Sequence, residues 1–409
     1  MSRLTAPRGT FDILPDQAGS RAAFEAVARE LLEAAGYARI ETPAFEATEL
    51  FARGVGESTD IVQKEMYSFD DGGGRSLTLR PEGTAPVCRA YLEHGMHKLP
   101  QPVRLYYLSS FFRAERPQAG RYRQFWQVGV EAIGSDDPAV DAEVIVLLAK
   151  LLERVGVHGT RLRLSSLAGP ATRAAYRDEL AAYLRSHAAR LAPSVRDRID
   201  LNPLRAFDSE DPGTREVMAG APRLLDRLDA QDAEHLATVR ELLDRAGVAH
   251  EIDPRLVRGI DYYTRTVFEF TSDALGAQSG VGGGGRYDGL VEVLGGPPTP
   301  GIGWAAGVER ILMAAGGRPV GARPVDLFVA YEQARGDAFA TVVEARAAGL
   351  AAEMELAGRT LKGQLKHADR LGARFVAIVE PGAVRLRDVR AGSERAVARE
   401  QVAAIVSGR

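Results

Sequence analysis

The stretch FFRAERPQAGRYRQFWQVGVEAIG, from Phe111 to Gly134, predicts two β-strands joined by a basic loop. Side chains alternate across a strand, so Gln127 and Glu131 share one face. Val128 and Val130 share the opposite face. An antiparallel sheet with one face against the core and the other free gives this alternation. Two interpretations stay open at this point: an ordinary solvated sheet surface, or the floor of a ligand site.

The loop between the two strands favours a ligand site. It combines the turn formers Pro117 and Gly120 with three arginines, Arg116, Arg121 and Arg123. Each guanidinium is a planar fork of donors that suits phosphate oxygens. The loop therefore predicts the binding of a polyanion.

The same stretch carries a family pattern. Phe111 to Phe125 resembles motif 2 of the class II aminoacyl-tRNA synthetases, Phe-Arg-x-Glu followed by a variable loop and Arg-x-x-x-Phe. LVRGIDYYTRTVFE, from Leu256 to Glu269, is similar to the signature peptide of histidyl-tRNA synthetases. The other matching segments, in the family's order around these two, are RGTFDILP (Arg8 to Pro15), GYARIETPAFE (Gly36 to Glu46, motif 1), TLRPEGTAPVCRA (Thr78 to Ala90), GGGGRYDGLV (Gly282 to Val291) and GIGWAAGVERIL (Gly301 to Leu312, motif 3).

This resemblance implies an α+β fold: a class II synthetase-like antiparallel sheet flanked by helices, with a helical insertion and a C-terminal α/β anticodon-binding domain. It implies ATP-dependent activation of L-histidine to histidyl-adenylate and transfer of the histidyl group to the 3' end of tRNA(His). ATP is then a substrate, with Mg²⁺ on its phosphates. Motif 1 forms the subunit interface in this family, which implies a homodimer.

The hydrophobic pattern agrees with a mainly antiparallel sheet. Helical spacing of apolar residues predicts a first helix over Gln17 to Ala35. Most of the strands that follow have no crossover helix between neighbours, which disfavours a doubly wound nucleotide fold. We expect the glycines at 280–285 to form a tight turn in which a ligand can approach the backbone closely. The predicted strands are Tyr37 to Glu46, Ser76 to Leu79, Val103 to Phe112, Arg123 to Ile133 and Thr264 to Phe270.

Composition divides the chain further. Residues 169–252 are rich in alanine and charge, which predicts a helical insertion within a catalytic domain of residues 1–322. Glycine and proline between 316 and 324 indicate a linker. Strand-like runs from Val325, Arg374 and Arg385 then alternate with helices, which predicts a small α/β domain over 323–409. A basic stripe there is either a solvated helix face or an RNA contact, and consists of Lys362, Lys366 and Arg370.

Joining histidine to ATP needs fixed positive charge, because the carboxylate attacks the α-phosphorus in line while pyrophosphate leaves. Arginine stays protonated at any relevant pH. The resemblance assigns this catalytic role to Arg113 and Arg258, although Arg258 could instead cap a turn beside Gly259. It assigns ATP binding to Arg113, Glu115, Arg121, Phe125 and Arg310, with the adenine between the Phe125 ring and the Arg310 guanidinium.

Histidine has two ring nitrogens that a carboxylate and a hydroxyl can engage together. By resemblance Glu131 and Tyr263 take these roles. For Glu82, a turn residue after Pro81 is the structural alternative. The resemblance gives the α-ammonium group to Glu82, Thr84 and Gln127, and the full histidine-binding set is Glu82, Thr84, Arg113, Gln127, Glu131, Arg258, Tyr262 and Tyr263.

The resemblance also implies contacts to transfer RNA. In the family the motif 2 loop meets the acceptor end, which predicts contacts from Arg116, Gln118 and Arg123, with Arg8 near the terminal phosphate. The net charge of −3 gives no support for RNA binding as an average, so local basic patches would be needed.

Length and composition set the remaining limits. The 409 residues, 45% of them hydrophobic, suffice for two or three domains with cores of their own. The single cysteine, Cys88, excludes intramolecular disulfides and disfavours a cysteine-based zinc site, and we predict no metal ligands from the protein. Without an apolar leader or a long apolar run, we expect a cytoplasmic protein and no membrane contact.

Two other functions would share parts of this pattern. One is a non-catalytic histidine-binding regulatory subunit of ATP phosphoribosyltransferase, which usually erodes the Arg-Gly-x-Asp-Tyr-Tyr signature and lacks the anticodon domain. This chain keeps Arg258 to Tyr263 and a final domain. The other is an RNA-binding protein without catalysis, which would explain the basic loop but not the polar pocket.

Overall fold

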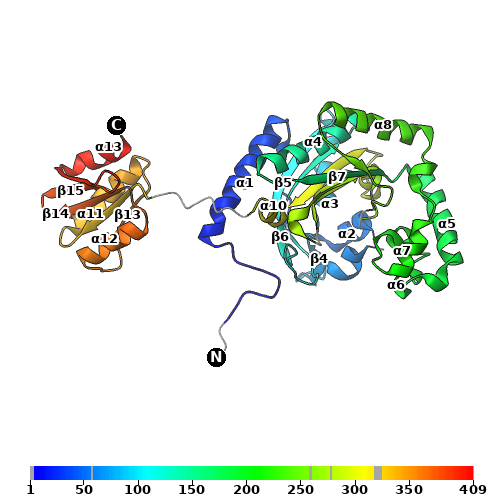
Figure 1. The fold of residues 1–409 in the computed structure, drawn as a ribbon, viewed down its shortest axis with the longest axis horizontal. Helices are drawn as coiled ribbons and strands as arrows, with labels where there is room; N and C mark the ends of the chain where they lie inside the picture. Colours follow the sequence, from blue (N-terminus) through cyan, green and yellow to red (C-terminus); the bar gives the residue numbers. More distant parts are fainter. Residues whose placement is uncertain (1–3, 57–58, 258–259, 277–278, 317–324, 409) are drawn as a thin grey trace. The chain divides into compact units, whose positions relative to one another are not determined.

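The computed structural model describes residues 4–56, 59–257, 260–276, 279–316 and 325–408. The chain forms two compact units, one of Met1–Leu14 and Ser20–Arg318, and one of Pro15–Gly19 and Pro319–Arg409. The predicted domain boundary at 322 and 323 lies outside the described residues. Figure 1 shows the fold of both units. Among the described residues, no helix combines the length and the apolar character needed to cross a membrane.

An eight-stranded sheet forms the centre of the first unit. Its two outer pairs are parallel and its inner pairs are antiparallel, so the expected mainly antiparallel sheet is confirmed. In spatial order the strands are β1 (Ala38–Arg39), β5 (Val103–Phe112), β6 (Gln124–Ile133), β11 (Gly301–Gly307), β10 (Gly280–Arg286), β9 (Thr264–Ser272), β7 (Thr160–Ser166) and β8 (Glu251–Ile252).

Two strand predictions need correction. The single strand expected over Tyr37 to Glu46 is divided into β1 and β2 (Phe45–Ala47), because the backbone leaves the large sheet before Pro43, which cannot donate to a ladder. β2 joins a separate sheet of three strands, in which β4 (Ser76–Leu79) lies between β2 and β3 (Tyr67–Asp70). The predicted strand Ser76 to Leu79 is therefore present but outside the large sheet.

The glycine-rich segment is also different from its prediction. It forms strand β10 in the middle of the large sheet, not a tight turn. A Cβ at Gly282 would lie 2.6 Å from the Cβ of Ala306, and one at Gly284 would collide with the carbonyl of Gly303. The expected close approach is real, but the partner is the neighbouring strand β11.

Helices cover both faces of the sheet. On one face, Val128 and Val130 of β6 pack with helices α1 (Pro15–Ala34) and α4 (Pro138–Arg154) in the largest core cluster. On the other face a smaller cluster joins β5 to helices α3 (Thr84–Glu93) and α9 (Leu290–Val293). Helix α2 (Thr48–Val55) contacts α3 and α9, whereas Val308 and Ile311 of α10 (Val308–Ala314) belong to the largest cluster. The polar face of β6 opens beside this smaller cluster.

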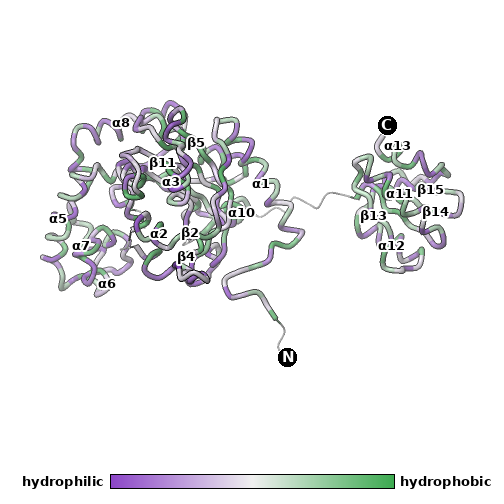
Figure 2. Tube along the Cα trace, turned by 180° about the vertical axis from the view of Figure 1, so that it is seen from behind, coloured by the Kyte–Doolittle hydropathy of each residue, from purple (hydrophilic) through white to green (hydrophobic). Residues whose placement is uncertain are grey.

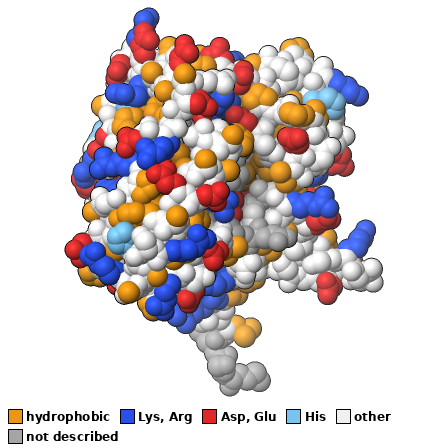
Figure 3. All heavy atoms as spheres, turned by 90° about the vertical axis from the view of Figure 1, so that its right-hand side faces the viewer, with side chains coloured by type: hydrophobic (Ala, Val, Ile, Leu, Met, Phe, Trp, Pro, Cys, Tyr) orange, Lys and Arg blue, Asp and Glu red, His pale blue; other side chains and the backbone are white. Residues whose placement is uncertain are grey.

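Most of the segment between β7 and β9 folds as helices, with strand β8 after the last of them, although β7 and β9 are direct neighbours in the sheet. The helices are α5 (Pro170–Ser186), α6 (Pro193–Arg196), α7 (Pro212–Ala219) and α8 (Ala230–Arg245). Hydrophilic and hydrophobic residues alternate along them (Figure 2). They enclose a core of their own, formed by residues such as Tyr176, Leu180 and Leu184. On the face that these helices present, Lys and Arg side chains are interspersed with Asp and Glu (Figure 3).

The second unit is a five-stranded sheet with helices. Its strand order is β13 (Ala352–Met354), β12 (Leu327–Tyr331), β14 (Phe375–Glu380), β15 (Ala383–Asp388) and β16 (Ser393–Val397). The sequence had indicated β12, β14 and β15 but not the two edge strands. The helices are α11 (Arg335–Ala347), α12 (Leu361–Arg370) and α13 (Val402–Ser407), and α12 exposes the basic stripe Lys362, Lys366 and Arg370.

Candidate active site

A cavity of about 560 Å³ opens on the polar face of β6. Its walls come from the loop between β5 and β6, from β10 and from α10. It contains every residue that the sequence pattern connected with ATP, namely Arg113, Glu115, Arg121, Phe125 and Arg310, together with Gln127. We call this space the arginine-lined cavity.

Four arginines and five carboxylates line the cavity, so cationic and anionic side chains are mixed in it. Arg113 lies with its Cζ 5.4 Å from the centre of the Phe125 ring, and its Nε donates to Pro81 O at 3.0 Å. Arg310 Nε donates to Gly280 O at 2.6 Å. Burial lowers the pKa of Arg310, and the nearby charge of Arg121 lowers it further. An anion placed among these groups would relieve that repulsion.

Carboxylates line the same cavity. Glu115 accepts from Arg121 Nη1 at 3.4 Å, and Glu65 and Glu269 also line the cavity. Burial raises the pKa of Glu65 above its ordinary value. In the described part of the chain no three His, Cys, Asp or Glu side chains are grouped as a metal site. Single carboxylates could still share a Mg²⁺ ion with phosphate oxygens, which is how such ions commonly bind.

Further along β6, Glu131 is completely buried. Its two carboxylate oxygens accept from the hydroxyls of Thr84, at 2.8 Å, and Tyr287, at 2.7 Å. Burial raises the pKa of Glu131 to about 8, although these donors oppose the rise. A carboxyl group held in this way can present either a donor or an acceptor to a ligand near neutral pH. Glu82, Thr84, Glu131, Tyr262 and Tyr287 are named here the Glu131 cluster.

Glycines leave the space that this cluster needs. A Cβ at Gly303 of β11 would collide with the Glu131 carboxylate. At Gly83 a Cβ would lie 2.5 Å from Tyr107 Cζ, and at Gly129 it would collide with the same ring. Three separate segments therefore lack side chains where Glu131 and Tyr107 need room.

Glu82 connects the cluster to helix α3. Its carboxylate accepts from the backbone N–H groups of Thr84 and Ala85, at 2.7 and 2.9 Å, so it satisfies the start of α3. It also accepts from the Tyr262 hydroxyl at 3.4 Å. Burial raises the pKa of Glu82, while the backbone donors and the charge of Arg113 act in the opposite direction. Arg113 thus lies where the Glu131 cluster meets the arginine-lined cavity.

Comparison with known proteins assigns this arrangement to a family. The profile of the family described as histidyl-tRNA synthetase matches residues 9–311. A histidine--tRNA ligase of Desulforudis audaxviator is 49% identical over 408 residues, covering 98% of this chain and 97% of that protein. The chain belongs to the histidyl-tRNA synthetase family.

Solved structures agree with this assignment. The crystal structure of apo histidyl-tRNA synthetase from S. aureus has a TM-score of 0.82 and 34% identity, covering 99% of this chain and all of that one. An ATP phosphoribosyltransferase regulatory subunit/histidyl-tRNA synthetase from Bacillus halodurans has a TM-score of 0.67 at 23% identity, which shows only a shared fold. The regulatory alternative is not favoured, since relatives with 46 to 49% identity over nearly the whole chain are histidine--tRNA ligases.

Among the described residues predicted to bind histidine, Arg113 and Gln127 line the arginine-lined cavity, whereas Glu82, Thr84, Glu131 and Tyr263 are buried and do not line it. Gln127 shares the arginine-lined cavity, and its Oε1 is buried with no donor among the residues that the structure describes. Tyr263 lies beside Tyr262, with ring centres 4.8 Å apart. Arg258, predicted as a catalytic residue, lies outside the described residues, as does Gly259.

The residues predicted to meet tRNA lie around the motif 2 loop, and Arg8, Arg116 and Gln118 are exposed. Arg123 is less free. Its backbone N–H donates to Gly9 O at 2.7 Å, and its guanidinium donates to Glu115 O at 3.3 Å and Arg8 O at 3.4 Å. Arg123 therefore fastens the N-terminal segment to the loop, a structural task that the sequence pattern did not reveal.

Tyr287 is the main residue that the sequence analysis missed. It stands in the quoted segment GGGGRYDGLV, but strand alternation could not place it, because β10 ends at Arg286. The signal in the sequence was Arg286, the arginine that ends this glycine-rich strand. Arg286 is fully buried and pairs with the buried Asp141 of α4 at 2.6 Å, which fixes the chain just before Tyr287.

Proposed function

We propose that this protein activates L-histidine with ATP to form histidyl-adenylate and transfers the histidyl group to the 3' end of tRNA(His). The observation that carries this proposal is the position of Arg113 between the arginine-lined cavity and the Glu131 cluster. Family membership supports the same reaction. One end of the site suits a triphosphate and the other suits a small polar ring.

Histidine would bind with its imidazole in the Glu131 cluster. Glu131 and Tyr263 would engage the two ring nitrogens, and Tyr262 would line the pocket. Glu82, Thr84 and Gln127 would hold the α-ammonium group, and the unpartnered Gln127 Oε1 supplies a suitable acceptor. The histidine carboxylate would then point toward Arg113, where the phosphates begin.

ATP would bind in the arginine-lined cavity, with its adenine between Phe125 and Arg310. Glu115 would accept from the adenine amino group, and Arg121 would hold the γ-phosphate. Arg113 and Arg258 would stabilise the charge that develops as the histidine carboxylate forms a bond to the α-phosphorus and the bond to pyrophosphate breaks. Mg²⁺ would accompany the phosphates beside Glu65 or Glu269.

Transfer RNA would meet the exposed side of the motif 2 loop, through Arg116, Gln118 and Arg123, with Arg8 near the terminal phosphate. The C-terminal unit, residues 323–409, would bind the anticodon, and the α12 basic stripe is available for phosphate contacts. By analogy with the family, we expect a homodimer through motif 1. We also propose a cytoplasmic location.

The decisive experiment is histidine-dependent exchange of labelled pyrophosphate into ATP, measured without tRNA. The wild type should exchange with histidine and not with other amino acids tested in parallel. Arg258→Ala should lose most of this activity, since it removes a charge proposed to act on the α-phosphate. Folded protein that binds histidine without any exchange would overturn the proposal and would support the regulatory alternative.

A further inference from the structure

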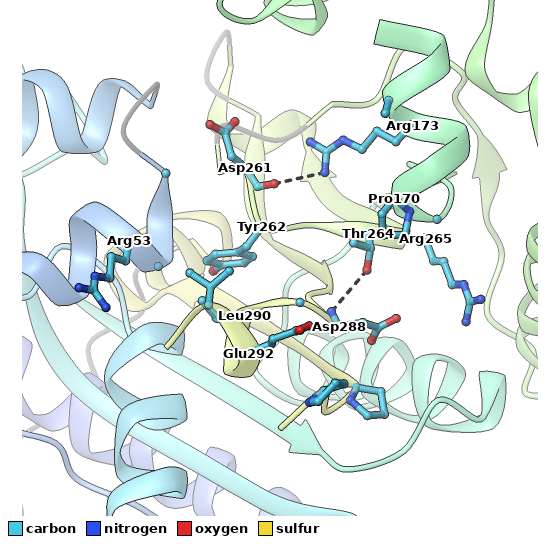
Figure 4. Close-up of a pocket in the computed structure, with 18 of the residues that line it drawn as sticks. Arg53, Pro170, Arg173, Asp261, Tyr262, Thr264, Arg265, Asp288, Leu290 and Glu292 are labelled. Carbon is cyan, nitrogen blue, oxygen red and sulfur yellow. Dashed lines mark hydrogen bonds between the residues drawn. The ribbon is translucent and has the colours of Figure 1, made fainter. Parts of the chain in front are cut away.

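Helix α5 of the insertion holds part of the histidine signature segment. Arg173, in the first turns of α5, points its guanidinium at the segment that contains Asp261 and Tyr262 (Figure 4). Its Nη1 donates to Asp261 O at 3.2 Å and also to Tyr263 O. One nitrogen therefore binds the carbonyls on both sides of the Tyr262–Tyr263 pair.

The position of Arg173 is unfavourable for a cation. It lies near the N-terminal end of a helix, where the macrodipole favours negative charge. Burial also lowers the pKa of Arg173 below its usual value. A residue that opposes local preference in two ways usually serves a site or a neighbouring segment. The two carbonyl contacts supply that reason here.

Other parts of the insertion contact the same segment, Asp261 to Tyr263. The Asn202 side chain donates to Asp261 Oδ1 at 3.2 Å. Tyr263 is buried in the core cluster of the insertion, together with Leu180 and Leu184 of α5. On the catalytic side, Asp261 N donates to Val55 O at 3.3 Å. The segment thus lies between the two parts of the first unit and is bonded to both.

A second cavity, of about 910 Å³, leaves one side of this segment without close packing. Tyr262 and Asp261 line it, as do Leu290 of α9 and Pro170 of α5. On that side of the segment, hydrogen bonds rather than packing hold the backbone in place. Figure 4 shows Arg173 reaching across to Asp261 at this point.

We infer that Arg173 is a positioning residue for histidine: from the insertion it fixes the backbone that orients Tyr262 and Tyr263 toward the substrate ring. This inference rests on the proposed function, because it concerns the same histidine site. Its consequence is that the insertion sets the affinity for histidine while leaving the affinity for ATP unchanged.

The test compares Arg173→Leu with Arg177→Leu in the full-length protein. Leucine keeps apolar bulk but removes the donors. Arg177 lies one turn later on the exposed side of α5 and donates to Leu201 O at 3.0 Å, so it controls for loss of an arginine from this helix. Histidine affinity is measured by calorimetry, and pyrophosphate exchange gives KM values for histidine and ATP. Thermal unfolding confirms that each variant is folded.

For Arg173→Leu we expect histidine Kd and KM to rise roughly 10- to 100-fold, the effect of a small misplacement of binding groups. The KM for ATP should change less than about twofold. Arg173→Lys should recover part of the histidine affinity, because one ammonium can donate to both carbonyls. If the wild type exchanges pyrophosphate and the two leucine variants have equal affinity for histidine, the inference is overturned. A wild type without exchange would instead contradict the proposed function.

Discussion

The arginine-lined cavity and the Glu131 cluster are neighbours that differ in solvent exposure and in how their polar groups are bonded. The cavity collects exposed or half-buried guanidiniums around open space, and two of the four, Arg113 and Arg121, come from one hairpin, β5 and β6 with their loop. The cluster is buried, and its polar groups bond to one another. It draws on segments near residues 82, 131, 262 and 287. A charged, flexible ligand suits the first design, and a small ring that must be distinguished from similar rings suits the second.

The largest effect should come from the buried end. Glu131→Ala removes the proposed ring contact and leaves the hydroxyls of Thr84 and Tyr287 without their acceptor. We expect kcat/KM for histidine to fall roughly 10⁴-fold, because a site built for hydrogen bonds loses heavily when one partner is missing. Pyrophosphate exchange with histidine varied at saturating ATP measures this. A loss under tenfold would contradict the assignment of Glu131 to the ring.

At the junction between the two ends, Arg113→Ala should act on the chemical step. We expect kcat of exchange to fall about 10²- to 10³-fold, the usual effect of removing one charge-stabilising group. The histidine KM should move much less, because the Glu131 cluster keeps its hydrogen bonds. Single-turnover formation of the adenylate distinguishes chemistry from binding. If kcat stays at the wild-type value and only KM rises, Arg113 binds substrate without stabilising the transition state.

The buried carboxyl should also make stability depend on pH. The pKa of Glu131 is raised to about 8, so the folded protein binds a proton that the unfolded chain has released. This contribution to stability is fully present below the unfolded pKa, about 4.3, and is lost as pH rises through about 8. Glu131→Gln cannot titrate and should lose less stability than the wild type between pH 5 and 8.5. Urea unfolding at several pH values measures the difference, and parallel curves would contradict the assignment.

A pair of glycines offers a milder contrast. Gly303→Ala places a methyl group against the Glu131 carboxylate, whereas Gly120→Ala adds one 3.5 Å from Arg310 Nη1, at ordinary contact distance. We expect Gly303→Ala to destabilise the protein by about 1–3 kcal/mol through overpacking and to raise the histidine KM. Gly120→Ala, at a φ of +74°, should destabilise the protein by about 1–2 kcal/mol through backbone strain and leave the histidine KM unchanged. Thermal unfolding and exchange kinetics test both, and equal histidine KM values would remove the contrast.

The same contrast explains how much could be predicted from the sequence. The part of the arginine-lined cavity that comes from the β5–β6 hairpin was predictable because its residues lie close together in the chain, where strand alternation places Phe125 and Gln127 on one face. The sheet and the helical insertion followed from apolar spacing and composition. Family resemblance supplied the roles, which the spacing alone left open for residues such as Glu82. In the structure the Glu82 carboxylate also accepts from the first backbone N–H groups of α3.

What failed were features fixed by contacts between distant segments. The glycines at 280–285 form a strand because β9 and β11 approach from both sides, which nothing local in the segment reveals. The bond from Tyr287 to Glu131 joins residues 156 positions apart. Arg173 lies in a segment whose composition predicts only helix, and its partners are backbone carbonyls without any pattern in the sequence.

The smallest effect should appear at the outer rim of the cavity, on the motif 2 loop that is proposed to contact tRNA. Arg116 is exposed on the motif 2 loop, whereas Arg123 is bonded to Gly9, Glu115 and Arg8. Arg116→Ala should therefore weaken tRNA use without disturbing the loop. We expect a severalfold higher KM for tRNA and a slope of log KM against log salt reduced by roughly one, as for one lost phosphate contact. Pyrophosphate exchange by Arg116→Ala should stay at the wild-type rate. The control is Arg154→Ala, which removes an exposed arginine at the end of α4 and should leave aminoacylation at the wild-type rate. If Arg116→Ala lowers exchange as strongly as aminoacylation, the loop arginines act on ATP, and the division between a nucleotide side and an RNA side of this loop is wrong.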